Sequence, residues 1–145
     1  MERKTIKILI CDQDRQTAEL LQIALREQSY CFQQVEDIEA AIQQLNPGKY
    51  HALVLGLHKE TSEGKLDGLR AIPILRKIDP ILPIITISYN DSLEIERQAR
   101  MAGIFYYLLQ PLDINEAQMS INNAVRKYER LSGNENMAID FSGDS

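Results

Sequence analysis

The sequence has no excess of basic residues. Its 145 residues include 16 Lys and Arg against 21 Asp and Glu, which gives a formal net charge of -5 at pH 7. A segment without a positive field has little to hold the phosphate backbone of a nucleic acid. We therefore expect no direct nucleic-acid binding by this segment, and binding to DNA would need another domain.

Long hydrophobic runs are also missing. No apolar stretch approaches the roughly 18 residues that a membrane-spanning helix needs, and the charged residues 1–5 are not followed by the apolar core of a signal peptide. We therefore expect no membrane contact and a cytoplasmic location.

Cysteine and histidine are scarce, with two of each. Cys11 and Cys31 fall in two different predicted strands. If these strands are parallel neighbours, the thiols lie near opposite ends, roughly 15 Å apart and too far for a disulfide. We interpret both cysteines as small core residues. His51 and His58 show no ligand spacing, so we predict no metal site and no cofactor.

What the sequence does contain is a regular alternation of two hydrophobic periodicities. Short β-branched or continuously apolar runs predict strands, and spacings of three and four predict helices between them. The expected strands are 5–11, 30–35, 50–56, 83–88 and 104–109, and the expected helices follow a cap at Asp14 and then cover 38–45, 67–78, 92–101 and 113–131. This pattern predicts an α/β fold: a doubly wound, flavodoxin-like sheet of five parallel strands with helices on both faces.

The run from Ala52 to Leu55 is apolar throughout, which is typical of a central strand covered on both faces. In such sheets the functional crevice lies beyond the carboxyl ends of the strands. The residue that stands there is Gly56, which has no side chain. The segment 57–65 is a loop longer than usual for this kind of connection, and Pro73 is expected to kink the next helix or delay its start.

Two regions are expected along the chain. Residues 1–131 form one domain, long enough to bury a core without metal or disulfides. Residues 132–145 have few apolar side chains, which predicts a flexible tail or linker.

From these residues the chain resembles the receiver domain of two-component response regulators over about residues 5–131. The resemblance is carried by Asp12 after the first strand, the run 66–69 that opens the third helix, Ser88 after the fourth strand, and Pro111 after the fifth. The spacing from Asp67 to Pro83 looks most like receivers of enhancer-binding transcriptional activators. The resemblance thus implies the N-terminal domain of a transcriptional regulator.

In that family an acidic pair after the first strand and an aspartate ending the third hold Mg²⁺, and this aspartate accepts a phosphoryl group. A hydroxyl residue and a lysine then neutralise the product. The chemistry requires hard oxygen ligands, a carboxylate nucleophile and a cation.

Three positions depart from the family pattern. Gln13 stands at the second acid, Gly56 at the phosphoacceptor and Gln110 at the lysine. We therefore interpret these residues, with Asp12 and Ser88, as a degenerate phosphorylation pocket with no catalytic residue.

Other positions keep the pattern but also allow structural readings. Asp12 keeps the first acid, or simply accepts backbone amides. Ser88 keeps the hydroxyl, or caps a turn. Tyr107 resembles the switch aromatic, or is packing, and Pro111 is compatible with a tight, cis bend.

The leading interpretation is a pseudo-receiver, a signalling module that is not an enzyme and acts through protein partners or as a homodimer. The implied face comprises the fourth helix, fifth strand and last helix, with Tyr106, Met119 and Val125 available outside the core. Two alternatives stay open. One is a phosphoacceptor that uses Glu60 or Glu63, and the other is a sensor that binds a small molecule in the vacated crevice.

Overall fold

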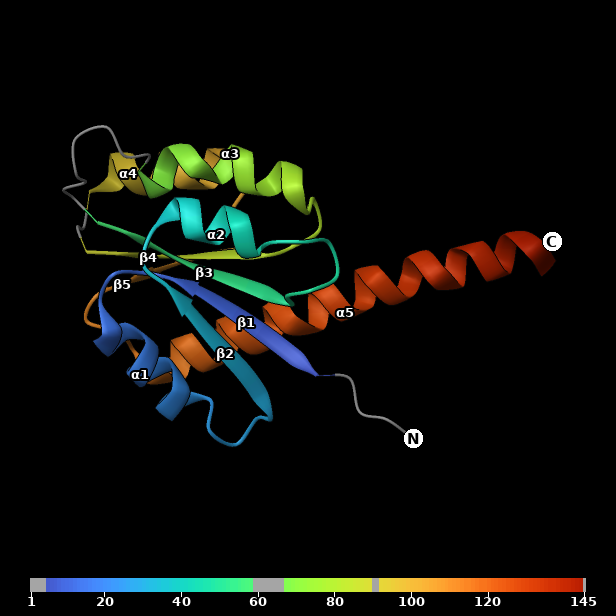
Figure 1. Ribbon diagram of the computed structural model, residues 1–145, viewed down its shortest axis with the longest axis horizontal. Helices are drawn as coiled ribbons and strands as arrows, with labels where there is room; N and C mark the ends of the chain where they lie inside the picture. The colour runs from blue at the N-terminus through green and yellow to red at the C-terminus, as the bar shows by residue number, and fades with distance from the viewer. Residues whose placement is uncertain (1–4, 59–66, 90–91, 145) are drawn as a thin grey trace.

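Figure 1 shows the structure, a computed structural model that describes residues 5–58, 67–89 and 92–144, with side chains described as far as residue 133. Its strands form one sheet in the order β2-β1-β3-β4-β5, and every neighbouring pair is parallel. The strands are β1 (Ile6–Cys11), β2 (Tyr30–Val35), β3 (Ala52–Leu57), β4 (Ile84–Ser88) and β5 (Tyr106–Leu109). The predicted sheet, with the apolar run from Ala52 to Leu55 at its centre, is confirmed.

Helices cover both faces of the sheet, as the sequence predicts. They are α1 (Arg15–Ala24), α2 (Ile38–Gln44), α3 (Gly68–Ile78), α4 (Leu93–Met101) and α5 (Ile114–Asp144). Figure 1 shows α1 and α5 on one face and α2, α3 and α4 on the other. Within the described part of the chain, no helix is both long and apolar enough to cross a membrane.

Side-chain caps fix where the helices begin. Asp14 accepts a hydrogen bond from the backbone N–H of Gln16 at 2.9 Å, which confirms the predicted cap of α1. Asp67 does the same for Arg70 at 2.8 Å at the start of α3. Each cap satisfies an N–H group that the first helical turn leaves without a partner. Because α3 begins at Gly68 and contains Pro73, the expected delay of its start is wrong.

Two apolar clusters fill the space between the sheet and its helices. The cluster facing α2, α3 and α4 includes Leu53, Leu55 and Ile72, all without exposed surface. The cluster facing α1 and α5 includes Ile10 and Ile121. Each central strand therefore contributes alternate side chains to opposite layers, as a doubly covered strand must.

Two other sequence-based expectations are corrected. Cys31 is exposed rather than a core residue, because it lies on the edge strand β2; Cys11 is buried as predicted. The register pairs Lys7 with Cys31, four residues before Cys11, so the cysteines do lie apart.

The expected end of the last helix at Leu131 is wrong. Helix α5 continues to Asp144 and extends beyond the sheet (Figure 1). Gly133 is tolerated because a helical glycine costs only about 1 kcal/mol relative to alanine. The role of residues 132–145 as a linker stays a prediction.

Candidate functional site

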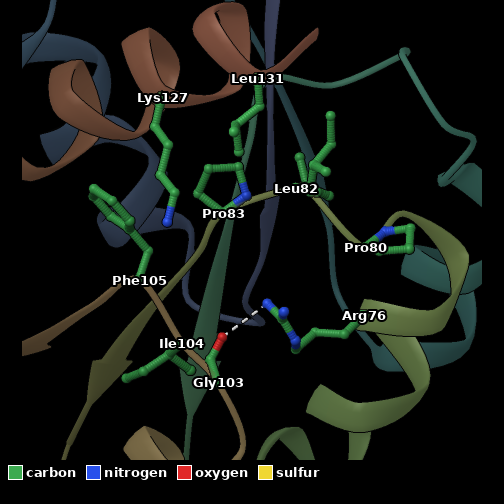
Figure 2. A pocket seen from close by; sticks show the side chains of 10 residues that line it. Arg76, Pro80, Leu82, Pro83, Gly103, Ile104, Phe105, Lys127 and Leu131 are labelled. Atoms are coloured by element: carbon green, nitrogen blue, oxygen red, sulfur yellow. Dashed lines mark hydrogen bonds between the residues drawn. The ribbon is translucent and has the colours of Figure 1, made fainter. Parts of the chain in front are cut away.

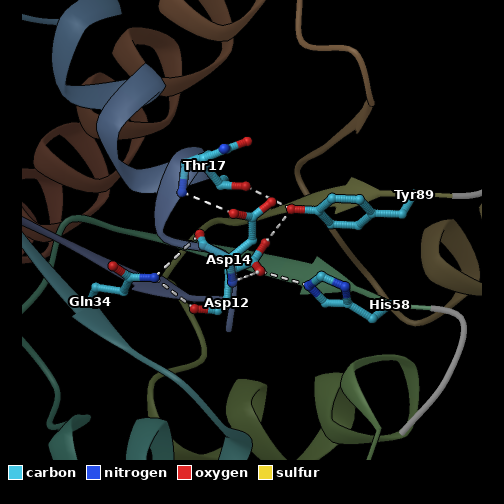
Figure 3. Close-up of polar contacts among 7 residues, drawn as sticks. Asp12, Asp14, Thr17, Gln34, His58 and Tyr89 are labelled. Atoms are coloured by element: carbon cyan, nitrogen blue, oxygen red, sulfur yellow. Dashed lines mark hydrogen bonds and ion pairs between the residues drawn. The ribbon is translucent and has the colours of Figure 1, made fainter.

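A buried carboxylate lies at the carboxyl edge of the sheet, where the sequence places the crevice. Asp12 follows β1 directly and is only 2% exposed. Its Oδ1 lies 2.6 Å from Nε2 of His58 and accepts the backbone N–H of Asp14 at 2.8 Å. Its Oδ2 accepts the phenol proton of Tyr89 at 2.8 Å (Figure 3). Both carboxylate oxygens are therefore engaged by donors of the protein itself.

Three strand ends bring these side chains together. Asp12 follows β1, His58 follows β3 and Tyr89 follows β4, and the carboxyl ends of neighbouring parallel strands meet at one edge of the sheet. The imidazole of His58 stacks on the phenol ring of Tyr89, with ring centroids 4.1 Å apart and an interplanar angle of 19°. The stack holds both rings against the carboxylate, and the side chain of His58 is 22% exposed.

Helix α1 and strand β2 complete the arrangement. The hydroxyls of Thr17 and Tyr89 lie 2.6 Å apart, and Thr17 is the donor because the phenol proton goes to Asp12. From β2, Nε2 of Gln34 donates to the backbone oxygen of Asp12 at 2.8 Å (Figure 3). We refer to Asp12, Thr17, His58 and Tyr89 as the Asp12 cluster.

The carboxylate of Asp12 occupies the space beside Gly56. A Cβ atom added at Gly56 would clash with Oδ2 of Asp12, lie 2.7 Å from its Cγ, and lie 3.2 Å from Nε2 of His58. Separations under 3.0 Å require the neighbour to move, and here the neighbour is a buried, hydrogen-bonded group. Glycine at this position is thus required by close packing, and the space beside it, expected to be vacated, is filled by Asp12 and His58.

The structure brings together some predicted site residues and separates another. Ser88 is buried at the end of β4, beside β3 in the sheet. Gln110 follows β5, and its side chain accepts the backbone N–H of Leu112 at 3.1 Å. The peptide bond from Gln110 to Pro111 is cis, which confirms the predicted bend. Gln13 is exposed and contributes no side chain to the cluster.

Tyr107 lies in the core on the α2–α4 side of the sheet, 7% exposed. It pairs in register with Thr86, and both buried hydroxyls have no hydrogen-bond partner among the described residues. This placement agrees with the packing interpretation of the aromatic. Its role as a switch stays a prediction.

Sequence reasoning missed His58, Tyr89 and Thr17. His58 was considered only as a metal ligand, although it stands two residues after Gly56 at a strand end. Tyr89 follows Ser88 immediately. Polar residues that directly follow parallel strands were the signal that could have found both.

Burial raises the pKa of Tyr89 to about 12, and the charge of Asp12 acts in the same direction. Hydrogen bonds with Thr17 and Gln110 oppose this effect. The pKa of Tyr128 is also raised to about 12, first by burial and then by its hydrogen bond to Asp79. Both phenols therefore stay protonated in the folded protein when they would ionise in the unfolded chain.

This difference predicts a loss of stability at alkaline pH. The unfolded tyrosines ionise near pH 10, whereas Tyr89 and Tyr128 hold their protons to about pH 12. The folded state then binds more protons, so the free energy of unfolding should fall as pH rises through this window. Urea denaturation at several pH values between 9 and about 12 measures the slope. Tyr89→Phe should flatten it, and an unchanged slope in this variant would contradict the assignment.

With this geometry established, comparison with known proteins assigns the family. Residues 8–122 match the family described as Response regulator receiver domain, and the chain belongs to it. The response regulator MprA of Mycobacterium bovis (strain BCG / Pasteur 1173P2) is 30% identical over 139 residues, covering 95% of this chain and 58% of that protein. The transcriptional regulatory protein GlrR of Escherichia coli (strain K12) is 23% identical over 127 residues, covering 88% of this chain and 28% of that protein.

Solved structures share the fold. The response regulator receiver domain protein (CheY-like) from Methanospirillum hungatei JF-1 superposes with a TM-score of 0.75 at 16% identity, covering 88% of this chain and 98% of that one. A putative response regulator from Chloroflexus aurantiacus J-10-fl has a TM-score of 0.73 at 25% identity, covering 85% and 99%. The chain spans a little over half of the mycobacterial relative and under a third of the Escherichia coli one.

Proposed function

We propose that this receiver domain is a pseudo-receiver, a signal-transduction module that regulates through protein contacts and carries out no phosphoryl transfer. The observation that carries the proposal is the Asp12 cluster, in which Nε2 of His58 lies 2.6 Å from the carboxylate of Asp12. The position resembling the phosphoacceptor is Gly56, and the space for its side chain is filled by Asp12. The domain is then not an enzyme.

The donor set also fits Mg²⁺ poorly. The ion prefers several oxygen ligands in octahedral geometry. Of the three family positions that carry an acid, only Asp12 keeps one. Both oxygens of its carboxylate accept hydrogen bonds, and the neighbouring Gln13 is exposed. Among the described residues, no group of three or more His, Cys, Asp or Glu could hold a metal ion.

Titration with Mg²⁺ tests this proposal. We expect a dissociation constant weaker than roughly 1 mM, because one already engaged carboxylate offers little to the ion. Amide shifts near Asp12 in two-dimensional NMR spectra report binding at the site itself. His58→Ala should strengthen binding modestly by releasing one carboxylate oxygen. A millimolar or tighter site in the natural chain, with shifts centred on Asp12, would argue against a degenerate pocket.

The phosphoacceptor alternative concerns Glu60 and Glu63, which lie outside the described residues. Replacement of both glutamates by glutamine tests this alternative against the pseudo-receiver. Any phosphorylation that depends on Glu60 or Glu63 should then disappear. The Escherichia coli relative is a transcriptional regulatory protein, and this similarity supports a role for the domain in the control of transcription. We propose that this domain acts there, in the cytoplasm.

For partner docking we propose the face formed by α4, β5 and α5. It carries exposed apolar side chains, with Met101 74%, Leu109 39% and Met119 48% exposed. Met119 lies one helical turn after Glu116, whose carboxylate accepts the hydroxyl proton of Tyr106, so it faces the β5 side of α5. The expectation that Val125 lies outside the core is wrong: it is 2% exposed and packs in the core cluster.

Association through this face predicts a specific variant effect. At roughly 50 µM, above the dissociation constant of a micromolar interaction, the natural chain should sediment as a dimer or bind its partner. Met119→Glu should weaken that association because it buries a charge. Ile23→Glu, a 55% exposed position on α1, is the matched control and should change nothing. Equal behaviour of the two variants would remove this face from consideration.

A further inference from the structure

A second concave site lies at the opposite edge of the sheet from the Asp12 cluster. The cavity has a volume of about 210 Å³ and is lined by the end of α3, the segments leading into β4 and β5, and the middle of α5 (Figure 2). Arg76 reaches it from α3, and Lys127 and Leu131 reach it from α5. No function described above uses it.

The guanidinium of Arg76 is held in place before any ligand arrives. Its Nη1 donates to the backbone oxygen of Gly103 at 2.9 Å. Gly103 has a φ of +97°, and a Cβ atom there would lie 3.0 Å from Nε of Arg76. Glycine therefore serves both the left-handed backbone conformation and the close approach of the guanidinium. Among the residues that the structure describes, the carbonyl oxygen of Gly103 is the one acceptor bonded to Arg76, so other N–H donors of its guanidinium can serve a ligand.

A second cation is positioned by an aromatic ring. The Nζ atom of Lys127 lies 5.2 Å from the centre of the Phe105 ring, within the range of a cation–π interaction. Figure 2 shows the ammonium of Lys127 and the guanidinium of Arg76 both directed toward the cavity. Among the described residues, none of those that line the cavity is Asp or Glu, although the whole chain has a net charge of -5. The cavity is thus a local positive site in an acidic protein.

Apart from Arg76 and Lys127, the side chains that line the cavity are apolar. They are mainly aliphatic, proline and aromatic side chains, among them Pro83, Phe105 and Leu131. A ligand for this site needs one anionic group for the two cations and a hydrocarbon body for the walls. A cavity of about 150 Å³ is enough to bind benzene, so this one has room for an aromatic ring and a carboxylate group. Inorganic phosphate would satisfy the cations but leave the walls uncovered.

We propose that this cavity binds a small aromatic monocarboxylate of about the size of benzoate. The carboxylate accepts hydrogen bonds from Arg76 and Lys127, and charge-assisted bonds of this kind are about twice as strong as neutral ones. The ring packs against Pro83 and Leu131. Because Lys127 and Leu131 belong to α5, the bound ligand would contact the helix that extends out of the domain.

Two-dimensional NMR titration of the whole chain tests the proposal, with benzoate as probe and neutral benzamide and inorganic phosphate as comparisons. We expect saturable amide shifts around residues 103–105 and 127–131, with a dissociation constant of about 1 mM or tighter. Benzamide and phosphate should each bind at least about tenfold more weakly, because each lacks one of the two required features. Shifts that do not saturate by roughly 20 mM benzoate, or equal binding of benzamide or phosphate, would overturn the proposal.

Matched variants locate the site. Lys127→Gln and Arg76→Gln should each weaken benzoate binding at least about fivefold through loss of a charge-assisted bond. Arg130→Gln and Lys77→Gln, exposed neighbours on the same helices, are the controls and should stay within about twofold. Thermal unfolding checks that each variant is folded. Lys127 is half-buried, so Lys127→Gln should fold and can test the site even if Arg76→Gln unfolds. An unchanged affinity for benzoate in Lys127→Gln contradicts the proposal.

Discussion

Replacing Asp12 with alanine is expected to lower the free energy of unfolding by about 3 kcal/mol. The change removes the acceptor for the phenol of Tyr89, the imidazole of His58 and the backbone N–H of Asp14. The hydrogen bond from the phenol of Tyr89 is part-buried. A polar group that is left buried without a partner costs about 1–3 kcal/mol. His58 is partly exposed, so water can solvate its imidazole once Asp12 is removed. The expected loss of stability is therefore at the lower end of the losses found when one partner of a buried ion pair is removed.

Urea denaturation measures this loss, and two further variants interpret it. Asp12→Asn keeps the volume and one acceptor oxygen, so it should be less destabilising than Asp12→Ala. A double-mutant cycle with His58→Ala isolates the interaction between the two side chains. A loss under about 1 kcal/mol in Asp12→Ala would mean that the cluster is incidental to the fold.

Restoring the phosphoacceptor residue alone is expected to fail. Gly56→Asp should give no phosphorylation by acetyl phosphate with Mg²⁺, and should lower the free energy of unfolding by about 2 kcal/mol. The new Cβ atom meets the carboxylate of Asp12, which cannot move without breaking its bonds to His58 and Tyr89. The site would also lack the acid replaced by Gln13 and the cation replaced by Gln110, and such groups act as a unit.

Rebuilding the site therefore needs several changes. The triple change of Gln13→Asp, Gly56→Asp and Gln110→Lys restores the missing charges, and a fourth, His58→Ala, frees the oxygen of Asp12. We expect Mg²⁺ binding to strengthen from the single to the triple to the quadruple variant. Gly56→Ser is the control for steric strain without a carboxylate. Rapid phosphorylation of the single variant Gly56→Asp would show that the pocket can work without the acid replaced by Gln13 and the lysine replaced by Gln110.

The fold could be predicted because the periodicity alternates between strand and helix along the chain. Continuous apolar runs such as Ala52 to Leu55 indicated buried parallel strands, and caps such as Asp14 marked helix starts. Val125 was misplaced although it follows Ile121 by four residues. The buried stripe of α5 also takes in this position, because the helix packs against both the sheet and α1.

The candidate site could be predicted only in part. Strand ends and spacing identified Asp12 and Gly56, since both depend on local pattern. The side chains that fill the space beside Gly56 are set by contacts of Asp12 with His58 and Tyr89. These two residues lie 46 and 77 positions further along the chain. Such contacts follow from strand order and rotamer choice, which a single sequence does not display.

The central claim is that this receiver domain works without phosphoryl transfer. The most direct test is intact-mass spectrometry of the natural chain after incubation with acetyl phosphate and Mg²⁺, beside a phosphorylatable receiver domain as positive control. The proposed pseudo-receiver predicts an unchanged mass while the control gains one phosphoryl group. A stable, stoichiometric phosphoryl adduct on this chain would contradict the claim.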